Sequence, residues 1–233
     1  MAESILYDYF RSSSCYRIRI ALYMVGETFE ARSIDLLKGD HKADAYKEIN
    51  PQGLVPFYKD EHCEIAQSMA ILEYLNQKYP QAELLHGSIE DQAYIRQMVM
   101  IVASDMHPYG NPRTWKGYLM EKLGHSQEEA MEWMHYWLHE GFKAYETFLV
   151  KQQKSGLFTL GDKVSLADIC LVPQLYNARR FNVDLSAYPL IQEIEKNCIV
   201  QDAFIKASPE HHSDAPQDLA PIHGIASPIQ ECA

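Results

Sequence analysis

The fold is decided by residues 5–25, which read Ile-Leu-Tyr-Asp-Tyr-Phe-Arg-Ser-Ser-Ser-Cys-Tyr-Arg-Ile-Arg-Ile-Ala-Leu-Tyr-Met-Val. The apolar beginning predicts a buried strand, and the apolar residues Ile18, Leu22 and Val25, at helical spacing, predict a helix after it. Gly26 follows at the point where a left-handed residue commonly ends a helix. The polar residues 12–15 therefore lie where the helix begins.

This serine-rich turn has two interpretations. The free backbone N–H groups at a helix start and the positive end of the helix dipole stabilise an anion or a thiolate. A serine there can also act only as a helix cap, which is the commoner role of an isolated serine run. Three arginines, Arg11, Arg17 and Arg19, form a basic cluster in an otherwise acidic chain and favour an anionic ligand.

The bulk composition limits the classes of function. The chain has 233 residues and 47% apolar content, enough for one large domain or two small ones with real cores. Its formal charge of −11 argues against a nucleic-acid or anionic-membrane surface. We find no apolar run of bilayer length and no signal-peptide pattern. The five cysteines are scattered and form no Cys-x-x-Cys pair, which is typical of a cytoplasmic protein with reduced thiols.

Strand and helix patterns alternate over residues 1–80. A second strand is expected over 29–36, a short helix over 44–49, a β-hairpin from 57–59 and 63–66, and a helix over 68–79. This order predicts a small α/β unit in which helices cover a mixed sheet.

Strand patterns end at a linker over residues 80–88. Helices are expected over 89–106, 127–153 and 165–181, and Ser165 with Asp168 predicts a capping box at the start of the third. Weaker helical segments occupy 189–207, and the end of the chain is rich in Pro, His, Ala and Ser. We therefore predict two domains, 1–80 and 88–212, and a loosely ordered tail over 213–233.

Two further features of the first domain fit the serine turn. A Val55–Pro56 bond just before an edge strand can be cis and can present the Val55 backbone to an extended peptide ligand. Taken alone, it is more often an ordinary trans turn. Gln67 and Ser68 stand directly before a helix, a position suited to a carboxylate, although a simple helix cap is the alternative.

These segments make the chain similar to the zeta class of glutathione transferases, whose members include maleylacetoacetate and maleylpyruvate isomerases. The resemblance extends to about residue 212, and it is carried by residues 11–22, 50–56, 67–75, 105–113, 166–174 and 177–185. The serine motif and the run Ala178-Arg179-Arg180-Phe181 are specific to the class. Val55-Pro56 and Gln67-Ser68 are common to glutathione transferases generally.

The resemblance implies a thioredoxin-like N-terminal domain that holds glutathione and an all-α C-terminal domain that closes the substrate pocket. It implies that Ser12 is catalytic, with Ser13 and Ser14 in the same motif. The residues that it implies for glutathione binding are Ser12, His41, Val55, Gln67, Ser68, His107 and Asn111. It also implies a homodimer.

One position departs from the family. The motif often reads Ser-Ser-Cys, whereas Ser14 occupies the third position here and the cysteine follows as Cys15. One step along a helix turns a side chain by roughly 100°, so we expect Cys15 to face elsewhere and to have no direct catalytic role.

The activity implied by the resemblance is glutathione-dependent cis–trans isomerisation of a maleyl keto acid to its fumaryl isomer, in aromatic amino acid catabolism. The alternative within the fold is a transferase that acts on α-halo acids or other small electrophiles. The isomerase substrate carries two carboxylates, which guanidinium groups bind bidentately. We expect Arg11, Arg113 and Arg180 to bind it, and the adjacent Arg179 to point elsewhere.

His135 and His139 share a helix face at a spacing that can bind zinc. The intervening Tyr136-Trp137-Leu138 lacks the glutamate of a catalytic zinc motif. We therefore expect packing or surface roles for both histidines and predict no metal site.

Overall fold

The computed structural model describes residues 4–219, 221 and 222, which form two compact units. Of the described residues, the first unit comprises 4–84, 200–219 and 221, and the second comprises 85–199 and 222. The boundary after Leu84 falls in the linker expected at 80–88. The sequence predicted residues 200–212 in the helical domain and 213–233 in a tail, whereas the structure groups residues 200–219 and 221 with the first unit. Residues 223–233 lie outside the described part of the chain.

The first unit is built on a four-stranded sheet in the order β2-β1-β3-β4. Its strands are β1 (Ser4–Asp8), β2 (Phe29–Ser33), β3 (Phe57–Lys59) and β4 (Glu64–Ala66). Strand β1 is parallel to β2 and antiparallel to β3, and β3 is antiparallel to β4. The sheet is therefore mixed, and this confirms the predicted α/β fold of the N-terminal domain.

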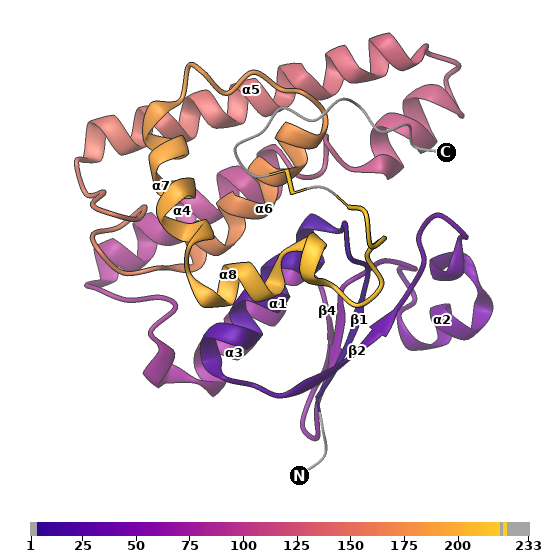
Figure 1. The fold of residues 1–233 in the computed structure, drawn as a ribbon, viewed down its shortest axis with the longest axis horizontal. Coiled ribbons are helices and arrows are strands. Elements are labelled where there is room, and N and C mark those ends of the chain that lie inside the picture. Colours follow the sequence, from indigo (N-terminus) through magenta and orange to yellow (C-terminus); the bar gives the residue numbers. More distant parts are fainter. Residues whose placement is uncertain (1–3, 220, 223–233) are drawn as a thin grey trace. The chain divides into compact units, whose positions relative to one another are not determined.

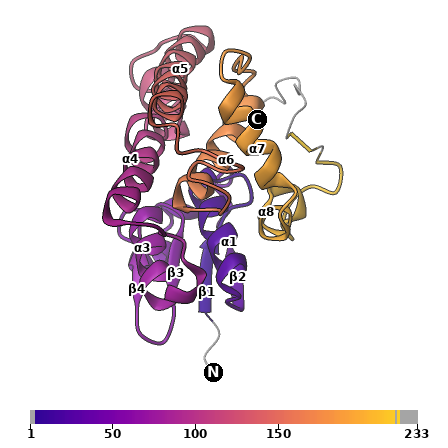
Figure 2. The same ribbon diagram turned by 90° about the vertical axis from the view of Figure 1, so that its left-hand side faces the viewer.

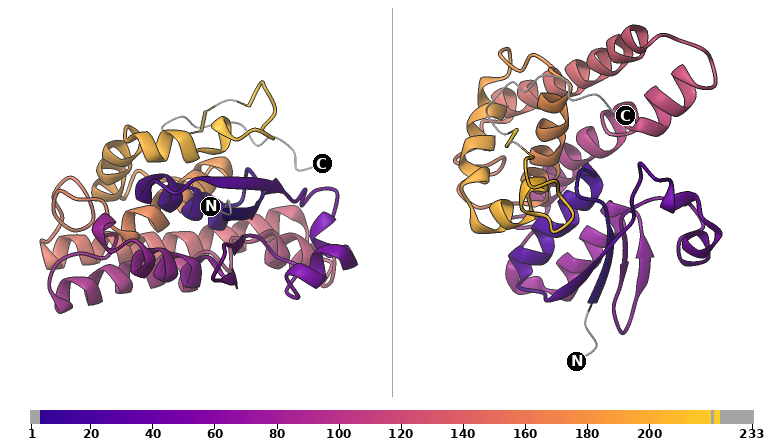
Figure 3. Two further views of the ribbon diagram at one scale, coloured as in Figure 1. Left: turned by 90° about the horizontal axis from the view of Figure 1, so that it is seen from below. Right: turned by 45° about the vertical axis from the view of Figure 1, so that its right-hand side comes forward.

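Helices cover both faces of this sheet. Helix α1 (Ser13–Val25) and α3 (Ser68–Lys78) pack together on one face, and α2 (Asp44–Ile49) lies on the other (Figure 3, right). Helix α8 (Asp202–Ala207) packs along α1 (Figure 1). Short 3₁₀ turns, η1 (Asp40–Lys42), η2 (Pro80–Ala82) and η4 (Pro209–His211), complete the unit. Helix α1 ends at Gly26, whose φ of 73° is left-handed as the sequence predicted.

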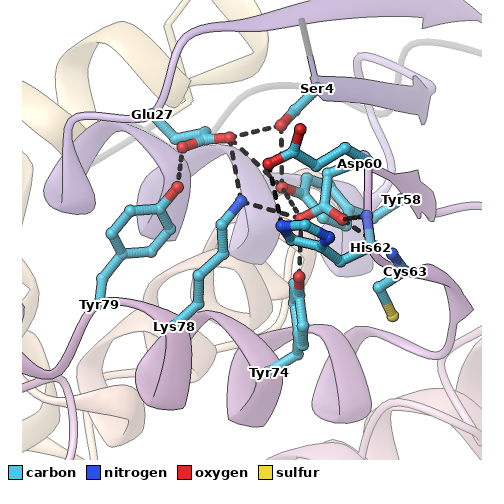
Figure 4. Close-up of polar contacts among 10 residues, drawn as sticks. Ser4, Glu27, Tyr58, Asp60, His62, Cys63, Tyr74, Lys78 and Tyr79 are labelled. Atoms are coloured by element: carbon cyan, nitrogen blue, oxygen red, sulfur yellow. Dashed lines mark hydrogen bonds and ion pairs between the residues drawn. The ribbon is translucent and has the colours of Figure 1, made fainter. Parts of the chain in front are cut away.

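A polar cluster fixes the C-terminal ends of α1 and α3 to the β3–β4 turn (Figure 4). The Lys78 ammonium lies 2.8 Å from an Asp60 carboxylate oxygen and 3.4 Å from Glu27. The Tyr74 hydroxyl donates to Asp60 at 2.8 Å, and the Tyr79 hydroxyl donates to Glu27. Helix α1 is about 20 Å long at 1.5 Å per residue, so this cluster lies far from the serine turn at its other end. We assign the cluster to stability.

The second unit is helical in all its regular elements within the described residues. It contains α4 (Ile89–Asp105), a π-helix η3 (Arg113–Met120), α5 (Gln127–Gln152), α6 (Leu166–Arg180) and α7 (Pro189–Ile199). Helix α6 lies between α4 and α7 and is buried along almost its whole length (Figure 2). The predicted capping box at Ser165 and Asp168 is present at its start. The π-helix over 113–120 was not predicted.

Candidate active site

The serine turn joins the central strand β1 to helix α1. Ser12 is the residue before the first turn of α1, with extended backbone angles of −74° and 117°. Its side-chain oxygen accepts a hydrogen bond from the Cys15 N–H at 3.3 Å, and its own N–H donates to the Tyr9 carbonyl at 2.9 Å. Ser12 and Ser13 are partly exposed, whereas Ser14 is buried. The turn therefore presents two serines at the positive end of the helix dipole.

A chain of hydroxyl groups connects Ser12 to the loop before β3. The Ser12 and Ser14 side-chain oxygens are 3.0 Å apart, and the Ser14 hydroxyl donates to the Val55 carbonyl at 3.2 Å. A hydroxyl has only one hydrogen, so Ser14, which uses its own on Val55, accepts the hydrogen of Ser12. Ser14 thus links the catalytic candidate Ser12 to Val55.

Val55 lies in a tight turn beside the loop that carries His41. The Val55–Pro56 bond is cis, as the sequence suggested. Within the described residues, the Val55 N–H donates to no protein acceptor and is open to a ligand. Gly53 has a φ of 59°, and a Cβ there would lie 2.7 Å from the His41 carbonyl oxygen. The close approach requires glycine and brings the His41 backbone next to the turn.

The His41 imidazole is half-buried in the η1 turn. Its Nδ1 is buried and has no hydrogen-bond partner among the described residues. Burial lowers its pKa, and the neighbouring Lys42 adds to this effect. A neutral imidazole with a free ring nitrogen can serve as a hydrogen-bond partner for a ligand at this turn.

A second position for an anion lies at the start of α3. Gln67 precedes the helix with a φ of 71°, and its side-chain amide donates to Gln52 at 2.7 Å. Ser68, the first helical residue, accepts a hydrogen bond from the Arg17 guanidinium at 3.4 Å. Arg17 is only 1% exposed. A buried cation and a helix N-terminus therefore act together on an anion bound at Ser68.

The other members of the basic cluster differ in environment. Arg19 is buried and forms an ion pair with Asp8 at 2.7 Å. Arg11 stacks over the Phe10 ring at 5.1 Å, and its buried Nε has no hydrogen-bond partner among the described residues. Arg11, next to Ser12, therefore retains hydrogen-bonding capacity for an anion.

Cys15 is fully buried, whereas Ser12 and Ser13 are partly exposed. Burial raises the pKa of its thiol well above the usual value, and the Asp8 carboxylate raises it further. The thiol therefore stays protonated at neutral pH even though it lies at a helix start. The sequence-based expectation for Cys15 agrees with this environment.

The predicted residues of the second unit gather around the π-helix. The Asn111 side chain accepts a hydrogen bond from the Arg113 N–H at 2.9 Å, and Arg113 begins the π-helix with an exposed side chain. The Arg180 guanidinium lies over the Phe181 ring at 4.9 Å. Phe181 in turn meets Trp115 of the π-helix edge-on at 5.7 Å. The Trp115–Phe181 contact thus brings together the segments that carry Arg113 and Arg180.

Three other side chains of the second unit have structural partners. Arg179 forms an ion pair with the buried Glu195, so the two adjacent arginines face different surroundings, as expected. His135 lies 2.8 Å from the Phe181 carbonyl, and His139 lies 2.9 Å from the Tyr188 hydroxyl. Both histidines take the packing roles expected from the sequence. His107 follows α4, and its N–H donates to the Val102 carbonyl at 2.9 Å.

Comparison with known proteins identifies this architecture. Residues 2–77 match the N-terminal domain model of glutathione S-transferases, and residues 106–202 match the C-terminal domain model. The chain belongs to the glutathione S-transferase family. A maleylacetoacetate isomerase from Rhizobium meliloti is 40% identical over 208 residues, which cover 89% of this chain and 97% of that protein.

Solved structures agree with this membership and place the chain in the zeta class. The holo structure of a zeta-class maleylpyruvate isomerase is 38% identical, covers 91% of this chain and 100% of its own, and superposes with a TM-score of 0.88. A maleylacetoacetate isomerase from Methylobacterium extorquens AM1, solved with malonate and glutathione, is 34% identical, with 91% and 99% coverage and a TM-score of 0.87.

Two features of this glutathione transferase were missed by sequence reasoning. Arg17 was noted only as part of a basic cluster, although it is buried beside Ser68. An arginine within the apolar pattern of a buried helix is the signal that could have singled it out. Trp115 and Phe181 gave no such signal, because their contact depends on the π-helix. Within the described residues, no group of three or more metal-ligating side chains is present, and no helix is long and apolar enough to cross a membrane.

Proposed function

We propose that this chain is a glutathione-dependent cis–trans isomerase that converts a maleyl keto acid to its fumaryl isomer. The observation that carries the proposal is the hydroxyl chain from Ser12 through Ser14 to the Val55 carbonyl, built at the start of α1. Full-length similarity to maleylacetoacetate and maleylpyruvate isomerases supports the same activity. Both maleylacetoacetate and maleylpyruvate are candidate substrates.

The donor set of the first unit fits glutathione. The open N–H of Val55 suits the cysteinyl backbone of the tripeptide. The start of α3 at Gln67 and Ser68, with Arg17 buried beneath it, suits the γ-glutamyl carboxylate. His41, whose backbone lies next to the Val55 turn at Gly53, has a ring nitrogen without a hydrogen-bond partner among the described residues. For His107 and Asn111, a role in glutathione binding rests on the family resemblance.

Bound glutathione would supply a thiolate that adds reversibly to the conjugated double bond, so that the bond rotates before elimination restores it. A free thiol has a pKa of about 8.5 and is mostly protonated at neutral pH. Ser12 would favour the thiolate by turning its single hydroxyl hydrogen from Ser14 to the sulfur, and Ser14 would then turn its own hydrogen from the Val55 carbonyl to Ser12. The α1 dipole would act in the same direction. Ser13, partly exposed beside Ser12, would support this role, and Ser14 would hold Ser12 in place.

We assign the substrate carboxylates to Arg11, Arg113 and Arg180. A relative that was solved with glutathione and malonate binds a small dicarboxylate, which supports this assignment. Arg11 has an unused buried Nε, and the segments of Arg113 and Arg180 meet through Trp115 and Phe181. Guanidinium groups hold carboxylates bidentately, and this would orient the double bond.

The remaining parts of the proposal concern assembly and location. A homodimer is inferred from the family resemblance, and sedimentation velocity would measure it. A cytoplasmic location is inferred from the cysteines, because Cys15, Cys63, Cys170 and Cys198 form no disulfide within the described residues.

An ultraviolet assay of the purified chain tests the activity. Maleylacetoacetate and maleylpyruvate are each supplied with and without glutathione while free thiol is titrated. Isomerisation that needs glutathione and leaves its concentration constant supports the proposal and identifies the substrate. Consumption of thiol with α-halo acids, without isomerisation, would replace it with the transferase.

Two variants test the residue roles in the same assay. Ser12→Ala should lower kcat by about 100-fold, because general electrostatic support of a thiolate is lost. Arg180→Ala should raise KM for the dianionic substrate far more than for a neutral thiol acceptor. Arg96, which is exposed on α4, provides the matched control as Arg96→Ala. Equal losses on both substrates in Arg180→Ala would refute the role of Arg180.

A further inference from the structure

The segment after α7 returns to the first unit and contacts the helix of the serine turn. The Tyr16 hydroxyl of α1 donates to the Phe204 carbonyl of α8 at 3.3 Å. The Arg19 Nε donates to the Ala207 carbonyl at the end of α8, at 2.8 Å. Residues 200–212 therefore form part of the environment of α1 rather than a free tail.

This segment delivers a histidine to a buried carboxylate. Asp8, the last residue of β1, is fully buried, and its Oδ1 lies 2.7 Å from the Arg19 guanidinium. Its Oδ2 lies 3.2 Å from Nε2 of His212, whose side chain is 4% exposed. The His212 Nδ1 accepts the Asp214 N–H at 3.1 Å, so Nε2 carries the hydrogen and donates it to Asp8.

The same network holds the backbone of the serine turn. Besides Asp8 and Ala207, Arg19 donates through Nη2 to the Phe10 carbonyl at 3.0 Å. Phe10 lies two residues before Ser12, and the Ser12 N–H closes a turn on the Tyr9 carbonyl. The orientation of Arg19, and with it the position of residues 9–12, therefore depends on Asp8.

We propose that His212 is a positioning residue for Ser12, acting through Asp8 and Arg19. This inference rests on the proposed function, because it assigns His212 to the alignment of the hydroxyl that would support the thiolate. His212 itself touches neither glutathione nor substrate in this scheme. It supplies the second hydrogen bond that fixes the buried Asp8 carboxylate, and Asp8 fixes the arginine that holds the turn.

Loss of the histidine hydrogen bond has a defined consequence. The Asp8 Oδ2 would be left buried without the hydrogen bond from His212. A buried polar atom without a partner raises the free energy of the fold, so a rearrangement that pairs it is favoured. The Arg19 guanidinium already contacts Asp8, and we expect it to rotate further toward this carboxylate and give up the Phe10 carbonyl. Residues 9–12 would then lose the hydrogen bond from Arg19 to the Phe10 carbonyl, and displacement of a catalytic group by about 1 Å can cost about 100-fold in rate.

Three variants of the full chain separate this role from simple destabilisation. His212→Leu removes the donor and keeps an apolar side chain, whereas His212→Gln keeps an N–H donor at a similar reach. His211→Leu is the matched control, because His211 lies in the same turn and its hydrogen bonds within the described residues go to Ser208, with 2.8 Å between its Nδ1 and the Ser208 hydroxyl. Each variant is measured at a temperature at which circular dichroism shows it to be folded.

Two readouts are compared. Hydrogen–deuterium exchange of residues 9–15 is followed without glutathione, and kcat, KM for glutathione and the pKa of the bound thiol are measured with it. His212→Leu should raise exchange in residues 9–15 and lower kcat by about tenfold or more, with KM for glutathione changed by less than about threefold. The pKa of the bound thiol should move toward about 8.5. His212→Gln should restore both readouts, and His211→Leu should change neither.

The outcomes are distinct for the two proposals. Unchanged exchange and unchanged kcat in a folded His212→Leu variant would overturn the role of His212. Equal effects of His212→Leu and His211→Leu would also overturn it. If the unmutated chain binds no glutathione, the proposed function fails. In that case increased exchange over residues 9–15 in His212→Leu alone would still support the positioning network.

Discussion

The buried Asp8 carboxylate makes a measurable contribution to the stability of the first unit. Burial by itself would raise the pKa of Asp8, but the charge of Arg19 and the hydrogen bond from His212 outweigh it and lower the pKa from 3.8 to about 2. Because the pKa is lower in the folded state, the contribution is complete above the unfolded pKa. It is lost as the pH falls through the folded pKa. A difference of this size corresponds to about 2 kcal/mol at neutral pH.

The variant Asp8→Asn tests this contribution. Asparagine keeps the size of the side chain but removes the ion pair, so the buried Arg19 guanidinium keeps the carbonyls of Phe10 and Ala207 and faces a neutral amide oxygen in place of a carboxylate. We expect the unfolding free energy of the first unit to fall by about 2–4 kcal/mol at pH 7. At pH 3 the unmutated chain has already lost about 1 kcal/mol of the Asp8 contribution, so the difference between the two chains should shrink by that amount.

The assay must report on the first unit alone. All three tryptophans, Trp115, Trp133 and Trp137, belong to the second unit, so their fluorescence does not serve. Hydrogen exchange of β1 amides in increasing urea gives the local unfolding free energy at each pH. Asp218→Asn, an exposed aspartate of the same unit, is the control and should leave it unchanged. The reasoning would be refuted if Asp8→Asn lowered the local unfolding free energy by less than about 0.5 kcal/mol at pH 7. It would also be refuted if Asp8→Asn lowered this free energy by the same amount at pH 7 and at pH 3.

Three further predictions follow from single positions. Cys15→Ala should keep kcat within about threefold of the unmutated value, because burial raises the pKa of the Cys15 thiol and leaves it protonated. Steady-state kinetics measure kcat, and a larger loss would contradict this prediction. Asp60→Asn should lower the unfolding free energy by about 1–3 kcal/mol, since Lys78 loses its ion pair at 2.8 Å and keeps Glu27 at 3.4 Å. The pKa of Asp60 is lowered in the folded state, so the difference in unfolding free energy between Asp60→Asn and the unmutated chain should become smaller in acid. Urea titrations at two pH values measure this difference. Gly53→Ala should lower the unfolding free energy by about 1–3 kcal/mol, because its Cβ would lie 2.7 Å from the His41 carbonyl oxygen. An unchanged midpoint of the urea titration would contradict this clash.

The sequence was sufficient for those elements whose signals are local. The serine turn, the glycine after α1 and the capping box at Ser165 each depend on residues within a few positions of one another. The helix over 44–49 and the hairpin at 57–66 follow from short apolar patterns and turn residues in the same way. Local hydrogen bonding decides these features, so a single sequence can predict them.

Features that depend on distant contacts were not accessible. A π-helix has no distinct spacing of apolar residues, and the run from Arg113 to Met120 was therefore not predicted. The contact between Trp115 and Phe181 joins residues far apart in the chain. The same holds for His212, which reaches Asp8 across 204 positions and was predicted at the end of the helical domain. No periodicity links such pairs, because only the folded chain brings them together.

The serine motif shows how the two kinds of information combine. The sequence placed Ser12, Ser13 and Ser14 at a helix start but did not distinguish them. In the fold, rotation along α1 buries Ser14 against the Val55 carbonyl and leaves the other two partly exposed. A cysteine at position 14, as the family motif often has, would donate only weakly to that carbonyl. The hydroxyl of Ser14 therefore gives this chain a direct link between the turn that carries Ser12 and the turn that would receive the peptide backbone of glutathione. The serine that departs from the family motif therefore adds a hydrogen bond between these two turns of the first unit.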